Sequence, residues 1–165
     1  YRLNPEIDVT LDSDVFRALC EAGMRAEQRH GLAAAVPHYK EAVDRYSGDF
    51  LAEEILGWPS LERENLSELY GVALDRLSRQ MEHLGMHYDT ARYCERVLAR
   101  DPCREDTHRR LMRALYLNGQ REKAIRQYYE CTAALRTQLD IDVSPATQAL
   151  FDAIQYGHKL PPISQ

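Results

Sequence analysis

The sequence of 165 residues is poor in glycine and proline, with eight and seven respectively, and it contains no long hydrophobic run. A helix that spans a bilayer needs roughly 18 to 20 consecutive apolar residues, and a secretory signal needs a basic start followed by an apolar block. Because neither pattern is present, we expect a cytoplasmic protein without a membrane partner. Good helix formers dilute the β-branched residues, so we expect an all-α domain.

Motifs that carry chemistry are also absent. The sequence has no GxxxxGK(S/T) phosphate loop, no GxGxxG and no GxSxG elbow. His83 and His87 are four positions apart, but Gly85 places a turn between them and no HExxH glutamate accompanies them, so a metal site is not indicated. The four cysteines form no CxxC pair, and we expect reduced structural thiols: Cys20, Cys94, Cys103 and Cys131. We therefore predict that the protein is not an enzyme and has no catalytic, cofactor-binding or metal-binding residue.

The charge is negative overall and uneven along the chain. With 21 basic and 26 acidic residues the formal charge is -5, which argues against a domain that binds nucleic acid by itself. Residues 1–60 hold six basic and eleven acidic residues, whereas residues 92–126 hold ten basic and five acidic ones. The sequence therefore predicts an acidic end and a basic band.

Apolar spacing of three and four residues is typical of helices and predicts seven of them. The first is expected to follow the N-cap Asp12 and to stop near His30, and the next five to span 33–46, 61–84, 88–100, 105–117 and 121–139. The last is expected to begin at Ser144-Pro145. Pro37 is expected in the first turn of the second helix, where its missing N–H is harmless, and Leu84 ends the buried stripe of the third. Ser144 followed by Pro145 is a strong start signal for the last helix.

A repeat of 34 residues organises the second half of the chain. Gly85 and Gly119 stand 34 apart, and the same offset links three further pairs: Thr90 with Ala124, Cys94 with Tyr128, and Val97 with Cys131. A helix, a glycine turn and a second helix with this period are typical of the tetratricopeptide repeat. A looser copy begins at Gly31. We therefore predict tetratricopeptide-like helical hairpins stacked in a right-handed superhelix.

Arginines on two neighbouring helices form the candidate interaction surface. Arg92, Arg96 and Arg100 are four residues apart and share one ridge, and further arginines follow on the next helix. We predict that this surface meets an acidic partner through five residues: Arg92, Arg96, Arg109, Arg113 and Tyr116. The alternative is a solvated face on which the arginines pair with nearby acidic residues: Glu95, Asp101, Glu105 and Asp106.

Beyond the repeat, several local motifs point to one family. They are Tyr1-Arg2-Leu3, Gly48-Asp49-Phe50-Leu51, Trp58, Asp101-Pro102-Cys103-Arg104-Glu105-Asp106, Leu111-Met112-Arg113-Ala114-Leu115-Tyr116, Asn118-Gly119 and Ser144-Pro145. With these motifs the chain resembles the bacterial transcriptional activator domain, the helical half of the Streptomyces antibiotic regulatory protein family.

The resemblance implies a division of the chain and a set of partners. Residues 1–11 would be an extended segment, the last strand of and linker from a missing winged-helix DNA-binding domain. Residues 12–156 would be the activator domain, and residues 157–165 a tail. The resemblance further implies that DNA is bound only through the absent N-terminal domain, while this domain contacts a second copy of itself, RNA polymerase or another protein.

Two other functions remain open from the sequence. One is a helical-repeat scaffold that binds a peptide in its groove without a DNA-binding partner domain. The other is a sensor whose pocket between hairpins holds a small-molecule effector. The groove of such a stack would be lined by aromatic side chains such as Tyr116 and Tyr129.

Overall fold

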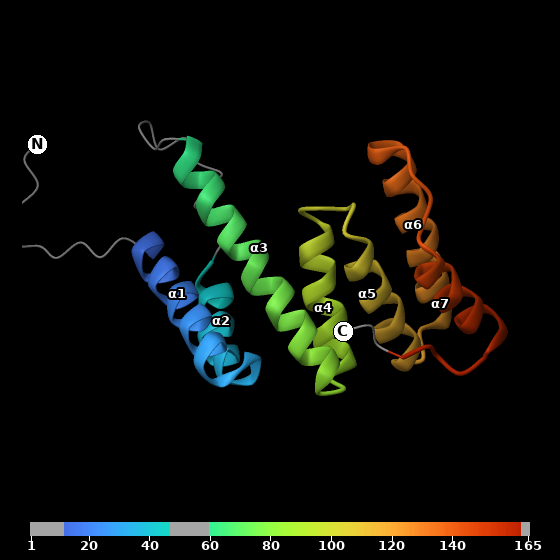
Figure 1. Ribbon diagram of the computed structural model, residues 1–165, viewed down its shortest axis with the longest axis horizontal. Helices are drawn as coiled ribbons and strands as arrows, with labels where there is room; N and C mark the ends of the chain where they lie inside the picture. Colours follow the sequence, from blue (N-terminus) through green and yellow to red (C-terminus); the bar gives the residue numbers. More distant parts are fainter. Residues whose placement is uncertain (1–11, 47–59, 163–165) are drawn as a thin grey trace, which may run out of the picture. The chain divides into compact units, whose positions relative to one another are not determined.

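The computed structural model describes residues 12–46 and 60–162, which form seven α-helices and no strand, so the all-α fold class is confirmed for this part of the chain (Figure 1). The helices are α1 (Asp12–His30), α2 (Leu32–Arg45), α3 (Ser60–His83), α4 (His87–Leu98), α5 (Glu105–Leu117), α6 (Arg121–Leu139) and α7 (Pro145–Tyr156). None of them is both long enough and apolar enough to cross a membrane. The expectations for residues 1–11 and for Trp58 lie outside the described residues.

The chain divides into two compact units, an N-terminal unit of Tyr1–Arg76 and a C-terminal unit of Leu77–Gln165. The boundary falls inside α3. Each unit has its own buried residues.

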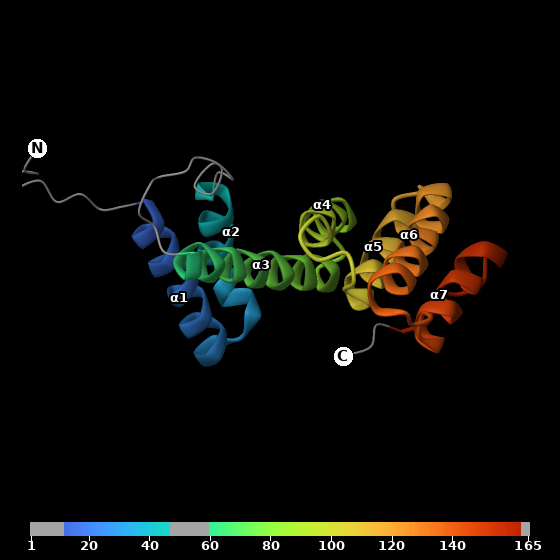
Figure 2. The same ribbon diagram turned by 90° about the horizontal axis from the view of Figure 1, so that it is seen from above.

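The N-terminal unit is built on the antiparallel pair α1 and α2, which lie side by side in Figures 1 and 2. Gly23 on α1 lets the ring of Tyr39 on α2 approach closely, since a Cβ at residue 23 would lie 2.6 Å from Tyr39 Cε1. An aromatic row continues this core, with ring centroids of Phe16 and Tyr46 5.0 Å apart and those of Tyr46 and Tyr70 4.0 Å apart. Apolar and aromatic contacts therefore hold this unit together.

The C-terminal unit packs α4, α5, α6 and α7 in succession, as both views show. Its core cluster draws on all four helices, and the largest side chains at its centre are Leu111, Met112, Leu150 and Ile154. The Ser144 side chain accepts a hydrogen bond from the Thr147 backbone N–H, and Pro145 follows at the first helical position, which confirms the predicted start of α7.

The residues predicted to repeat occupy equivalent places in the structure. Gly85 and Gly119 have φ angles of 70° and 75°, the left-handed region that a glycine adopts without strain. The next repeat pair, Thr90 and Ala124, is fully buried. Gly31 has the same backbone form, with φ 83°, but α2 begins at the next residue, whereas α4 begins two residues after its glycine. Because the turn at Gly31 is shorter by one residue, the sequence repeat that begins there matches the later repeats less regularly.

Two local predictions are wrong. Pro37 is the sixth residue of α2 and lies inside the helix, because α2 begins directly after Gly31 rather than two residues later. Pro37 therefore removes one backbone hydrogen bond from the helix interior. Leu84 is 57% exposed instead of buried, because α3 ends at His83 and the following turn carries Leu84 away from the stripe.

Candidate functional site: an arginine-lined pocket

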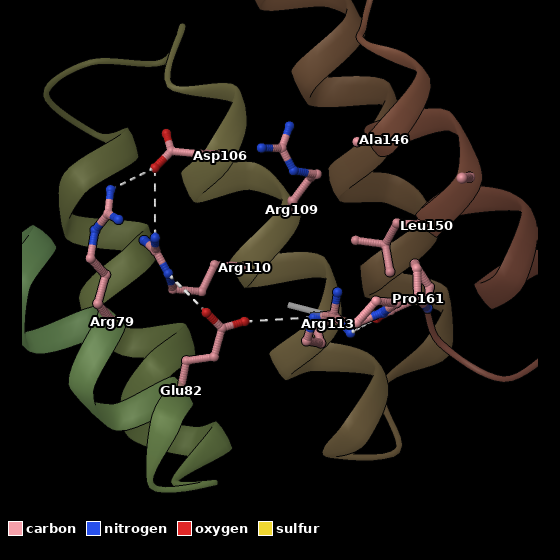
Figure 3. Close-up of a pocket in the computed structure, with 11 residues that line it drawn as sticks. Arg79, Glu82, Asp106, Arg109, Arg110, Arg113, Ala146, Leu150 and Pro161 are labelled. Atoms are coloured by element: carbon pink, nitrogen blue, oxygen red, sulfur yellow. Dashed lines mark hydrogen bonds and ion pairs between the residues drawn. The ribbon is translucent and has the colours of Figure 1, made fainter. Parts of the chain in front are cut away.

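A pocket of about 250 Å³ opens in the C-terminal unit, between the C-terminal end of α3, one face of α5, α7 and the segment after it (Figure 3). Four of its lining side chains are arginines and two are carboxylates. The full lining consists of Arg79, Glu82, Asp106, Arg109, Arg110, Arg113, Ala146, Ala149, Leu150, Pro161 and Pro162. The pocket is therefore a cationic hollow with an apolar wall on the side of α7.

Arg110 is the buried centre of the pocket wall, with only 6% of its side chain exposed. Its Nε donates to Glu82 Oε2 at 3.2 Å, and its Nη1 donates to Ser78 Oγ at 3.0 Å. Its Nη2 lies 3.6 Å from Asp106 Oδ2, one turn earlier on α5. A buried guanidinium requires such partners, because an uncompensated charge away from water is costly.

The charges around Arg110 alternate along a row that Figure 3 marks with dashed lines. Arg79 Nη2 donates to Asp106 Oδ2 at 3.2 Å, at one end of the row. At the other end, Arg113 Nε lies 3.6 Å from Glu82 Oε1. The row thus places three arginines around two carboxylates and keeps a net positive charge, with Arg113 at its inner end.

Arg113 also anchors the segment that follows α7. Its Nη1 donates to the Pro161 carbonyl at 2.7 Å, and this contact brings residues 161 and 162 to the pocket mouth. Burial lowers the pKa of the Arg113 guanidinium, although the Glu82 carboxylate counteracts this, and the nearby Arg109 charge lowers it further. The two arginines therefore repel each other in a partly water-excluded place.

Arg109 lies outside the row, and its hydrogen bonds run to residues at the start of α7. Its Nη1 donates to Thr147 Oγ1 at 3.1 Å and lies 3.7 Å from Glu105 Oε1. Glu105 accepts from the Ser144 backbone N–H at 2.7 Å and from the Thr147 hydroxyl. Burial alone would raise the pKa of Glu105, but the hydrogen bonds from Thr147 and Ser144 outweigh burial and hold that pKa below its ordinary value. Glu105 thus stays ionised and ties α5 to α7.

The structure separates the residues predicted to form one interaction surface. Arg109 and Arg113 both line the pocket, but Arg92, Arg96 and Tyr116 do not. The pairing expected under the solvated-face alternative occurs for Arg109, whose ion-pair partner is Glu105. Tyr116 is half-buried and packs against the core cluster of the C-terminal unit.

Arg92 makes a separate, more exposed site on α4. It lies 3.4 Å from Asp89, donates to the Tyr93 hydroxyl at 3.2 Å, and its guanidinium sits 5.0 Å from the centre of the Tyr93 ring. Beside it is a smaller hollow of about 160 Å³. The residues lining that hollow are Tyr88, Ala91, Arg92, Glu95, Leu115, Asn118, Gln120 and Lys123. Tyr88 is 73% exposed there.

Sequence reasoning missed Arg79 and Glu82 as pocket residues and did not select Arg110. A signal was present in α3, where Ser78 and Glu82 are four residues apart on a face whose other members, such as Leu77 and Met81, are buried and apolar. A polar pair on an apolar helix face indicates a polar partner on the neighbouring element.

No metal cluster emerges from the described residues. No group of three metal-ligating side chains converges anywhere within 12–46 and 60–162. Burial raises the pKa of Cys20, Cys94 and Cys131 to about 12, so these thiols stay protonated and behave as small apolar side chains.

Comparison with known proteins gives the chain a family. The family model described as "bacterial transcriptional activator domain" matches residues 11–155. Regulatory protein DnrI of Streptomyces peucetius is 28% identical over 152 residues, which are 90% of this chain and 56% of DnrI. Transcriptional regulatory protein MoaR1 of Mycobacterium tuberculosis (strain ATCC 25618 / H37Rv) is 24% identical over 144 residues, which are 87% of this chain and 46% of MoaR1. The chain spans about half the length of these curated relatives.

A solved structure shares the fold. That structure is Mycobacterium tuberculosis EmbR in complex with a low affinity phosphopeptide, with a TM-score of 0.59 and 22% sequence identity. The match covers 98% of this chain and 42% of the EmbR chain. At this identity the likeness concerns the helical fold alone.

Proposed function

The chain belongs to the family of bacterial transcriptional activator domains, and we propose that it is the regulatory and protein-interaction domain of a DNA-binding transcriptional activator. The family match over residues 11–155 carries this proposal. The similarity to DnrI and MoaR1, both named as regulatory proteins, supports it.

In this proposal another part of a longer cytoplasmic protein binds DNA, and this chain acts on the bound complex. The formal charge of -5 supports such a division, because phosphate binding draws mainly on lysine and arginine. The curated relatives are about twice as long as the matched region, which leaves room for a DNA-binding domain in them.

The partner surface we propose is the exposed side of α4, and its partner is RNA polymerase or a second copy of the activator. Arg92 is half-exposed beside the hollow that Tyr88 and Lys123 help to line. An exposed tyrosine next to basic side chains suits an acidic protein surface, since tyrosine and arginine are enriched at protein interfaces. Arg109 and Arg113 fit this role less well because contacts within the domain already hold them.

A reporter assay with the full-length activator that contains this chain tests the proposal. The double variant Arg92→Glu/Arg96→Glu should lower promoter activation about fivefold or more, since losing one charged interface contact costs roughly 1 kcal/mol or more. DNA binding, measured by gel shift, should stay unchanged. The matched control is Arg29→Glu/Lys40→Glu, two exposed basic residues of the N-terminal unit, which should leave activation unchanged.

Two results would contradict the proposal. Equal activation by the α4 variant and the wild type would remove α4 as the partner surface. Failure of the full-length protein to bind any promoter DNA would favour the scaffold function over the activator.

A further inference from the structure

The pocket brings together the guanidinium groups of Arg109 and Arg113, and only some of their N–H donors are engaged in other contacts. Arg109 and Arg113 are one helical turn apart on α5, so their side chains are neighbours on one face. Among residues 12–46 and 60–162, the polar contacts of Arg109 run through Nη1, and those of Arg113 run through Nε and Nη1. Each arginine therefore keeps its Nη2 donors available within the described part of the chain.

The electrostatics of the pocket favour an anion. Its lining contains four guanidiniums and two carboxylates, and the positive excess persists when Glu105 beside Arg109 is included. Ala146, the second residue of α7, also lines the pocket, so the positive end of the α7 dipole faces the same space. The mutual repulsion of Arg109 and Arg113 is a cost that a bound anion would relieve.

We propose that this pocket binds a compact phosphate-bearing anion, with Arg109 and Arg113 as its ligands. A phosphate monoester carries close to two negative charges near neutral pH and offers three oxygens, enough to accept from both guanidiniums. A single carboxylate has one charge and two oxygens, which one guanidinium satisfies. The proposal goes beyond the role in transcription, because it assigns a small-molecule ligand to the pocket of this domain.

The shape of the pocket limits the ligand to a small one. Its volume of about 250 Å³ is just below the roughly 300 to 1,000 Å³ of drug-sized ligand pockets. Ala149, Leu150 and Pro162 supply an apolar wall against which a short carbon skeleton can rest. The Arg113 contact to Pro161 holds one side of the mouth, so residues 161 and 162 close part of the entrance.

The test is titration calorimetry of the 165-residue chain with inorganic phosphate at constant ionic strength. Arg109→Gln and Arg113→Gln should each weaken phosphate binding about tenfold or more, since a hydrogen bond between charged groups contributes roughly 1.5 to 3 kcal/mol. Arg92→Gln, on α4 and outside this pocket, should change the affinity less than about twofold.

A second variant avoids the risk that Arg113→Gln loosens the fold. Ala146 is exposed and stands in the first turn of α7, where an acidic residue is favourable for the helix. Ala146→Glu places a carboxylate opposite the arginines and should abolish phosphate binding. Ala33→Glu is the matched control, because Ala33 is the exposed second residue of α2 and gains the same helix-end charge.

The outcomes separate cleanly. Loss of phosphate binding in Ala146→Glu and in the two arginine variants, with the controls unchanged, supports the proposal. No phosphate binding by the wild-type chain overturns it, and so does equal binding by Ala146→Glu and Ala33→Glu. Malonate that binds as tightly as phosphate overturns the phosphate assignment. None of these results depends on promoter activation, so the transcriptional role can fail or hold independently.

Discussion

The two units of the chain differ in the polar groups that they bury. Within the described residues, the N-terminal unit buries only two polar or charged residues, Ser13 and Asp75. The C-terminal unit buries eight: Ser78, Gln80, Thr90, Thr107, His108, Arg110, Gln127 and Thr147. The N-terminal unit has an ordinary hydrophobic core, whereas the C-terminal unit encloses the row of charged side chains around Arg110.

This difference shows where a binding site can arise in a helical domain. Apolar packing of the kind seen around Phe16 and Tyr39 favours stability. A row such as Arg79, Asp106 and Arg110 requires exact partners, but it also positions charged groups rigidly beside a hollow. The C-terminal unit therefore combines the structural and the candidate binding roles.

The largest effect is expected from removing the buried arginine. Arg110→Ala takes partners away from Glu82 and Ser78 at a nearly fully buried place, and it should lower the free energy of unfolding by about 3 kcal/mol. Urea unfolding followed by circular dichroism measures this loss. Arg79→Ala is the control, because Arg79 is 43% exposed and its ion pair with Asp106 should contribute about 1 kcal/mol or less. An Arg110 variant as stable as the Arg79 variant would show that the charged row does not hold the unit together.

A smaller effect on stability is expected in the N-terminal unit, from replacing two glycines that both lie inside helices. Gly23→Ala forces a Cβ to within 2.6 Å of the Tyr39 ring, which the hydrogen bond from the Tyr39 hydroxyl to Glu27 at 2.9 Å helps to fix. Overpacking of this kind costs about 1 to 3 kcal/mol. At Gly71 an added Cβ meets, apart from its chain neighbours and the backbone of its own helix, no heavy atom of the described residues within 4 Å.

Gly71→Ala should therefore stabilise the protein by roughly 0.5 to 1 kcal/mol, because alanine loses less backbone entropy in a helix. Thermal unfolding of both variants shows whether the signs are opposite. If Gly23→Ala also raised the melting temperature, the close contact between α1 and α2 would not limit the packing of the N-terminal unit.

Local signals in the sequence predicted the helices well. Glu105–Leu117 and Arg121–Leu139 have the predicted bounds, since glycine turns and apolar spacing act over a few residues. Pro37 was misplaced because its position depends on a turn one residue shorter at Gly31 than at the later glycines. Short-range rules do not carry the exact length of a turn.

The pocket could be predicted only in part. A high density of arginine pointed to anionic recognition and selected Arg109 and Arg113, both of which line the pocket. Arg79 and Glu82 come from α3, more than twenty residues earlier, and only the packing of α3 against α5 brings them to the same place. Such convergence is a property of tertiary structure, which one-dimensional spacing does not encode.

The smallest expected effect is on the pH dependence of stability, and it arises in the C-terminal unit and not in the N-terminal one. His108 in the C-terminal unit is buried, with Nε2 2.9 Å from the Pro102 carbonyl and Nδ1 2.7 Å from Gln127 Nε2. Burial lowers the pKa of His108 below its ordinary value of 6.5, although the Pro102 carbonyl and the carboxylates of Glu130, Glu105 and Asp106 act in the opposite direction.

Because the unfolded chain takes up a proton near pH 6.5 while folded His108 stays neutral, stability should be lost as the pH falls below about 6.5. The depressed pKa of Glu105 acts separately, since its contribution is lost only as the pH falls below about 4.5. Urea unfolding at about pH 7.5 and about pH 5.5 should therefore show a smaller loss for His108→Gln than for the wild type. His30→Gln, an exposed position in the N-terminal unit, should leave the loss unchanged. An equal pH dependence of His108→Gln and the wild type would mean that His108 is not held neutral in the fold. Burial of His108 in the C-terminal unit would then make no contribution to the loss of stability at low pH.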